Sequence, residues 1–198
     1  MDLAGVSRHE PVTVDAGRRA AVIAPVVFRD ERPHILFTKR ADHLGEHPGQ
    51  MSFPGGGREP SDADLRATAL RESNEEIGLR PEEADFHGRL DDIRTVTDYA
   101  VSPFVATVPD REYEPDRREV AEIAVLAVDD LTARANYESE RRDHPQYGEI
   151  RLHFFHVDGY TVWGATGRML VQLLELTTDW RVPEEVDRVV DPDADYPV

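Results

Sequence analysis

Three glutamates in the middle of the chain have the spacing of neighbours on one helix face. Glu72, Glu75 and Glu76 stand at positions i, i+3 and i+4, and side chains at that spacing project from the same side of a helix. Like charges so placed destabilise a helix, and near its C-terminus the helix dipole also disfavours anions. Two local rules are broken together, which is the mark of a functional site.

A divalent cation would remove both penalties, because carboxylates are the oxygen ligands that Mg²⁺ and Mn²⁺ prefer. The simpler alternative is that an acid-rich chain exposes glutamates everywhere and that these three are merely solvated. The full pattern, Arg-Glu-x-x-Glu-Glu-x-Gly with a further glycine upstream, is improbable by chance at this composition. It therefore predicts a metal site occupied by Mg²⁺ or Mn²⁺.

The segment Gly57–Leu79 resembles the Nudix box of pyrophosphohydrolases. The matching residues are Gly57 and Arg71-Glu72-x-x-Glu75-Glu76-x-Gly78-Leu79. One departure is that the first glutamate of the pattern falls on Ala63. The acids Asp62 and Asp64 flank that position, but neither is in register. A second departure is Ser73, which stands where an aliphatic residue is usual.

The residues upstream narrow the resemblance to the coenzyme A pyrophosphatases. Their signature has a strand ending in Thr-x-Arg, a leucine, a histidine, Gly-Gln and Phe-Pro-Gly-Gly, and Leu36–Gly56 is similar to it. The segments 97–105, 119–123 and 162–166 also resemble that subfamily, so the likeness spans about Ala20 to Leu176.

This resemblance implies a fold and a set of roles. The fold is α/β (α+β), an α/β/α sandwich with a mixed β-sheet and a loop-helix-loop catalytic motif. Glu72, Glu75 and Glu76 match the metal-binding glutamates, and the carbonyl of Gly57 is a further ligand candidate; a glycine there would allow close approach and unusual dihedral angles. Arg71 is expected to orient a glutamate through a bidentate pair.

The implied reaction is hydrolysis of the pyrophosphate of coenzyme A, giving 4′-phosphopantetheine and adenosine 3′,5′-bisphosphate. The general base is left open between a box glutamate, Glu75 or Glu76, and Glu119 on a later loop. The candidates for contacting the substrate and its 3′-phosphate are Lys39, Arg40, His47 and Arg58.

Two other functions remain open at this point. One is Nudix hydrolysis of a different nucleoside diphosphate derivative, such as ADP-ribose or NADH. The other is a non-catalytic Nudix-fold module that only binds a ligand. The intact glutamate cluster argues against the second, because a binding module has no need of it.

Strands and helices must position these residues. Apolar, partly β-branched runs predict strands over 20–28, 34–38, 51–53, 89–95, 101–108, 120–128 and 150–157. The box helix is expected to begin at a Ser61 cap, with Asp64 completing a capping box, and to stop at Gly78. A second helix is expected over 165–176, with Leu170, Leu173 and Leu174 facing the core.

We expect one Nudix hydrolase domain over residues 1–198. Residues 1–17 form a polar N-terminal arm, loosely packed or a short helix, and residues 183–198 form a polar C-terminal tail, in which Asp191–Asp195 are too polar to pack and are expected to fray. The length suits a single domain with its own core.

Composition limits the partners. The 40 Asp and Glu against 23 Lys and Arg give a formal charge of −17, which argues against nucleic acid and against a basic membrane anchor. The absence of cysteine excludes disulfides and thiolate chemistry.

Neither a membrane span nor a secretory leader is evident, so we expect a cytoplasmic monomer or homodimer that binds a small nucleotide. Lys39 is the only lysine, and the acid excess with so little lysine favours a halophilic source over a GC-rich genome alone.

Overall fold

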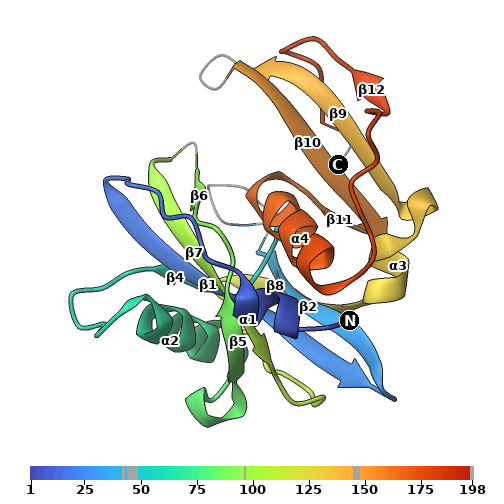
Figure 1. Cartoon of the computed structure of the whole chain (residues 1–198). Coiled ribbons are helices and arrows are strands. Elements are labelled where there is room, and N and C mark those ends of the chain that lie inside the picture. Colours follow the sequence, from blue (N-terminus) through green and yellow to red (C-terminus); the bar gives the residue numbers. More distant parts are fainter. Residues whose placement is uncertain (42, 44–48, 96, 145–147, 197–198) are drawn as a thin grey trace.

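The computed structural model describes residues 1–196 except 42, 44–48, 96 and 145–147 (Figure 1). Its main sheet contains eight strands and has the order β3-β2-β1-β7-β5, with β4, β6 and β8 paired to members of that path. The strands are β1 Arg18–Arg29, β2 Arg32–Arg40, β3 Met51–Ser52, β4 Gly55–Gly57, β5 Asp85–Arg89, β6 Ile93–Arg94, β7 Tyr99–Thr107 and β8 Val120–Ala127. Because β1 runs parallel to β7 and antiparallel to β2, the sheet is mixed, as expected.

Helices cover both faces of this sheet (Figure 1). Alternate residues of β1 face opposite ways: Ala21 and Ile23 join the cluster that includes α2 (Leu65–Ile77), whereas Val22 and Ala24 join the cluster that includes α4 (Gly164–Thr177). The predicted α/β/α sandwich is therefore confirmed. No helix in the described part of the chain is long and apolar enough to cross a membrane.

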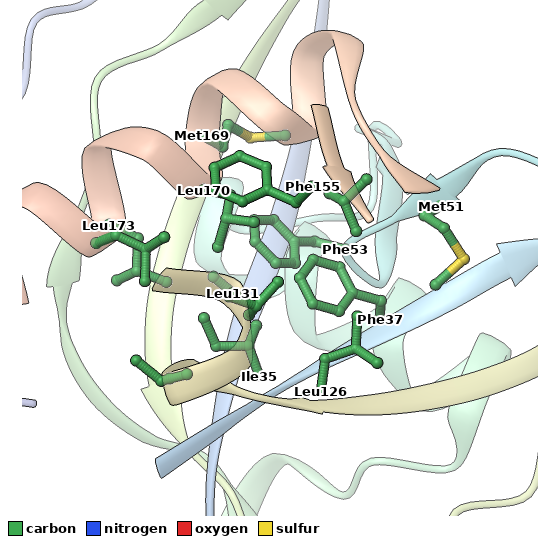
Figure 2. Packing of buried hydrophobic residues seen from close by; sticks show 14 of the residues in the cluster. Ile35, Phe37, Met51, Phe53, Leu126, Leu131, Phe155, Met169, Leu170 and Leu173 are labelled. Carbon is green, nitrogen blue, oxygen red and sulfur yellow. The ribbon is translucent and has the colours of Figure 1, made fainter. Parts of the chain in front are cut away.

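The core beneath α4 is the larger of the two. Figure 2 shows Leu170 and Leu173 of α4 packed toward Phe155, Phe53 and Phe37. The rings of Phe37 and Phe53 stack with centroids 5.1 Å apart. This contact fixes the segment that leads from β3 into β4 and hence the entry to the box.

A second sheet extends beyond the sandwich. It has the order β11-β10-β9-β12 and comprises β9 Tyr137–His144, β10 Gly148–Val157, β11 Tyr160–Val162 and β12 Arg188–Val189. The sequence analysis predicted only β10, because the charged run of β9 has no apolar alternation. Short helical segments complete the chain: α1 Ala4–Arg8, α3 Val128–Thr132, and 3-10 turns at Pro81–Glu83 and Arg134–Asn136.

Both chain ends pack more closely than their composition suggests. In the N-terminal arm, α1 buries Val6 to 1% exposure against the α4 core, so the short-helix alternative is right and the loose one is wrong. In the C-terminal tail, β12 pairs with β9, and the buried guanidinium of Arg142 donates to the carbonyls of Pro192 and Ala194. Partners distant in sequence therefore hold the tail at β12, Pro192 and Ala194, while most of its described side chains are exposed, as their polar character predicts.

Candidate active site

The box helix α2 begins one turn later than predicted. Its N-cap is Asp64, whose carboxylate accepts a hydrogen bond from the amide of Ala67 at 2.8 Å. Ser61 is not the cap. Gly78 ends the helix in the left-handed conformation with φ 67°, as predicted. Ser73 is buried against β4 and donates to the carbonyl of Pro54, which accounts for a polar residue at that position.

Glycines let α2 lie close to β4. A side chain on Gly55 would meet the carbonyl oxygen of Ala21 at 2.3 Å, and its φ of 146° is strained for any other residue. A Cβ on Gly56 would lie 2.6 Å from the carboxylate of Glu72. At Gly57, by contrast, a Cβ would meet nothing within 4 Å and φ is not in the left-handed region. The predicted unusual dihedral angles are therefore wrong for Gly57 and are found at Gly55 instead, whereas the role of the Gly57 carbonyl as a metal ligand stays a prediction.

Glu72 and Glu76 are sheltered against this glycine strand. The backbone amide of Gly55 donates to Glu76 Oε2 at 2.9 Å. Burial is the main cause that raises the pKa of Glu76 to about 8, with the charges of Glu72 and Glu119 adding to it. Burial also raises the pKa of Glu72, partly opposed by Arg71. Such shifts show carboxylates held close together and out of water.

Glu75 differs from the other two, because its side chain is 58% exposed and its carboxylate turns toward Arg71 at 3.2 Å. Arg71 also donates to Glu72 at 3.0 Å and to the carbonyl oxygen of Gly57 at 2.9 Å. Each glutamate accepts one hydrogen bond from Nη1, so the predicted bidentate pair between Arg71 and a glutamate is not formed. The bidentate partner of Arg71 is instead the buried Asp62, which was not expected from the sequence.

The loop before β8 brings Glu119 and Arg40 to the same place. The amide of Asp116 donates to the carbonyl of Glu76 at 2.8 Å, and the amide of Ala41 donates to the carbonyl of Glu119 at 2.8 Å. The exposed Glu119 lies near enough to raise the pKa of Glu76 and of Glu72, and Arg40 near enough to oppose the rise at Glu76. Glu119, on the loop before β8, and Arg40, at the end of β2, therefore act electrostatically on the buried carboxylate of Glu76.

The remaining substrate candidates lie elsewhere or outside the described residues. Lys39 donates to Glu122 at 3.0 Å, and Glu122 also accepts from the hydroxyl of Tyr160 at 2.8 Å. Arg58 is exposed and makes only a long contact, 3.5 Å, to the carbonyl of Asp62. His47 falls among the residues that the structure does not describe.

The donor set suits a hard divalent cation. Glu72, Glu75, Glu76 and the Gly57 carbonyl offer only oxygen, and two of the carboxylates are desolvated without full charge compensation. Among the described residues, no three Asp, Glu, His or Cys side chains already lie close enough together to hold a metal ion. The positions of Glu75 and Glu76 account for this, because one carboxylate turns to Arg71 and the other to Gly55.

Comparison with known proteins defines the class. The NUDIX domain family model matches residues 17–147, more than half of the chain. The chain therefore belongs to the NUDIX domain family, and it is a pyrophosphohydrolase of that family. The matched region contains the box, β8 and the loop that carries Glu119.

Curated relatives support the same assignment over most of the chain. An uncharacterized Nudix hydrolase NudL of Enterobacter sp. (strain 638) is 37% identical over 160 residues, covering 79% of this chain and 81% of the relative. A NudL of Yersinia pestis (strain Pestoides F) is 33% identical over 171 residues, covering 86% and 85%. Neither name gives a substrate.

Solved structures share the fold at low identity. A MutT/nudix family protein from Enterococcus faecalis has a TM-score of 0.53 at 12% identity, covering 85% of this chain and 64% of that one. A NUDIX hydrolase from Alicyclobacillus acidocaldarius has a TM-score of 0.50 at 20% identity, covering 60% and 82%. These likenesses bear on the fold alone.

Proposed function

We propose that this enzyme hydrolyses the pyrophosphate bond of coenzyme A or its derivatives, giving 4′-phosphopantetheine and adenosine 3′,5′-bisphosphate. The observation that carries the proposal is that the segment resembling the coenzyme A signature ends on the carboxylates of the box: the Gly55 amide donates to Glu76 at 2.9 Å, and Gly56 lies against the carboxylate of Glu72. The same segment, β2 through β4, contains Arg40, and its β4 glycines lie directly against the carboxylates of Glu72 and Glu76.

In this proposal Glu72, Glu75, Glu76 and the carbonyl of Gly57 hold Mg²⁺ or Mn²⁺. The ion offsets the charge of the diphosphate and makes a water molecule a better nucleophile. Arg71 keeps Glu72 and Glu75 in place through its two Nη1 hydrogen bonds. Either Glu119 or a box glutamate accepts the proton of the attacking water.

Arg40 is the better candidate than Lys39 for a phosphate near the scissile bond. Its charge lowers the pKa of Glu76, and the amide of the next residue, Ala41, donates to the carbonyl of Glu119. Lys39 is instead engaged by Glu122, which Tyr160 also contacts. We therefore assign Lys39 to a more distant part of the substrate, together with Glu122 and Tyr160.

The competing substrate class is another nucleoside diphosphate derivative, such as ADP-ribose or NADH. The test is incubation with coenzyme A, dephospho-coenzyme A, ADP-ribose and NADH in high salt with Mg²⁺ or Mn²⁺, with products resolved by mass. We expect coenzyme A to be cleaved fastest, at the pyrophosphate. Much faster cleavage of ADP-ribose or dephospho-coenzyme A would contradict the proposal, because neither carries the 3′-phosphate.

A further inference from the structure

We propose that Asp62 is a positioning residue of the active site, holding Arg71 so that Arg71 can hold Glu72, Glu75 and the carbonyl of Gly57. It takes the place of the first glutamate of the box pattern, which is absent here because Ala63 occupies that position. The inference rests on the proposed function in one respect, namely that Glu72, Glu75 and the Gly57 carbonyl are metal ligands.

The hydrogen bonds of Arg71 fall into two sets. On one edge of the guanidinium, Nε and Nη2 donate to the two carboxylate oxygens of Asp62 at 3.0 and 3.1 Å. The other donors reach Glu72, Glu75 and the Gly57 carbonyl at 3.0, 3.2 and 2.9 Å. A guanidinium has five N–H groups, so every donor is used, and the Asp62 pair fixes the plane in which the other three point.

Asp62 is itself rigidly placed. Its carboxylate is 5% exposed, and besides Arg71 it accepts from the amide of Glu59 at 2.8 Å and the hydroxyl of Thr68 at 2.9 Å. Thr68 lies in the first turns of α2 and Glu59 in the loop before it, so Asp62 is hydrogen-bonded both to the helix and to the loop that leads into it. The carboxylate of the neighbouring acid, Asp64, instead caps the helix by accepting from the amide of Ala67.

The charge of a bound divalent cation explains why Arg71 needs Asp62 as a partner. A divalent cation among Glu72, Glu75 and the Gly57 carbonyl places positive charge beside the guanidinium and draws the same oxygens toward itself. Held by those ligands alone, Arg71 would be repelled from its place. The carboxylate of Asp62 contacts the opposite edge, does not compete for the ion, and supplies the compensating negative charge.

The test compares Asp62→Asn with Asp64→Asn as a matched control. Asparagine at 62 keeps the size but loses the charge and one acceptor for Arg71, whereas asparagine at 64 remains a good helix cap. Binding of Mn²⁺ is measured without substrate, by calorimetry, and KM and kcat are measured over a range of Mn²⁺ concentrations. We expect Asp62→Asn to weaken Mn²⁺ binding by about 10- to 100-fold and Asp64→Asn to leave it unchanged.

A restoring variant separates positioning from mere folding. Ala63 is exposed, so Asp62→Ala can be combined with Ala63→Glu to put a carboxylate back in the register of the box. We expect the double variant to bind Mn²⁺ more tightly than Asp62→Ala alone and to recover kcat at a fixed Mn²⁺ concentration. If Asp62→Asn binds Mn²⁺ as the wild type does, or if the double variant is no better than Asp62→Ala, the inference is overturned.

The wild-type measurements keep the two proposals distinct. If the wild type binds Mn²⁺ but prefers ADP-ribose to coenzyme A, the substrate proposal fails while the Asp62 comparison is unaffected. If the wild type binds no Mn²⁺ at all, the ligand assignment fails and the role of Asp62 fails with it.

Discussion

The two long helices cover opposite faces of one sheet and are built on different principles. Helix α4 buries large apolar side chains, including Met169, Leu170 and Leu173. Helix α2 fully buries Thr68, Ala69, Ser73 and Ile77 and packs Leu65 and Leu70 at the edge of its cluster. The comparison teaches that α4 is held mainly by large apolar side chains, whereas α2 combines a smaller apolar contact with polar contacts of the residues that we assign to the chemistry.

The largest effect is expected from Glu76→Gln in α2. Removing a proposed metal ligand should lower kcat by more than about 100-fold, because loss of a group outside the ligand set already costs about 10- to 100-fold. The substitution keeps the size and the hydrogen bond from Gly55, so the fold should persist. Steady-state kinetics and circular dichroism check both parts, and unchanged activity in this variant and in Glu75→Gln would contradict the metal assignment.

The opposite result, a loss of stability with unchanged activity, is expected from Leu173→Ala in α4. Leu173 is fully buried, and a cavity at such a position costs about 2–5 kcal/mol of unfolding free energy. Since Leu173 lies far from the glutamates, kcat measured well below the unfolding temperature should not change. Urea denaturation and kinetics together test this; a fall in kcat without loss of stability would show that the two helices do not divide their roles as we describe.

The stability contributed by Glu76 of α2 should depend on pH. Burial raises the pKa of Glu76 to about 8 in the folded chain, so the folded state binds this proton more tightly than the unfolded one. The stability due to this group is therefore fully present below its ordinary pKa and is lost as the pH rises through about 8. In metal-free buffer, the unfolding free energy of the wild type should fall relative to Glu76→Gln across that range, and Mn²⁺ should reduce the fall.

The smallest effect is expected from Gly56→Ala. The added methyl group meets only the flexible end of Glu72, so stability should change little, whereas displacement of that carboxylate should weaken Mn²⁺ activation by up to about tenfold. Gly55→Ala is the contrasting variant, since its φ of 146° and its backbone clash predict a loss of about 1–3 kcal/mol in stability. Thermal unfolding and Mn²⁺ titrations separate the two; equal effects on stability would contradict the assigned contacts.

The sequence by itself determined the box helix, the face shared by its three glutamates, its end at Gly78 and most strands of the main sheet. These features follow from local periodicity and from the conformational preferences of single residues, which need no distant partner. Local preference also misled at the start of the helix, where Ser61 was the predicted cap and the folded loop makes Asp64 the cap instead.

The tertiary structure alone decided which charges meet. Asp62 is out of register with the box pattern, yet folding of the preceding loop places it on Arg71. Glu119 reaches Glu72 and Glu76 across more than forty positions of sequence, while the adjacent Lys39 and Arg40 engage different neighbours. Strand β9 likewise forms by pairing along its length with β10, and the C-terminal tail forms β12 by pairing with β9. The physical reason is the same throughout: spacing along the chain can place charged side chains on one face of a helix, but their energy is set by partners that only the folded chain brings near.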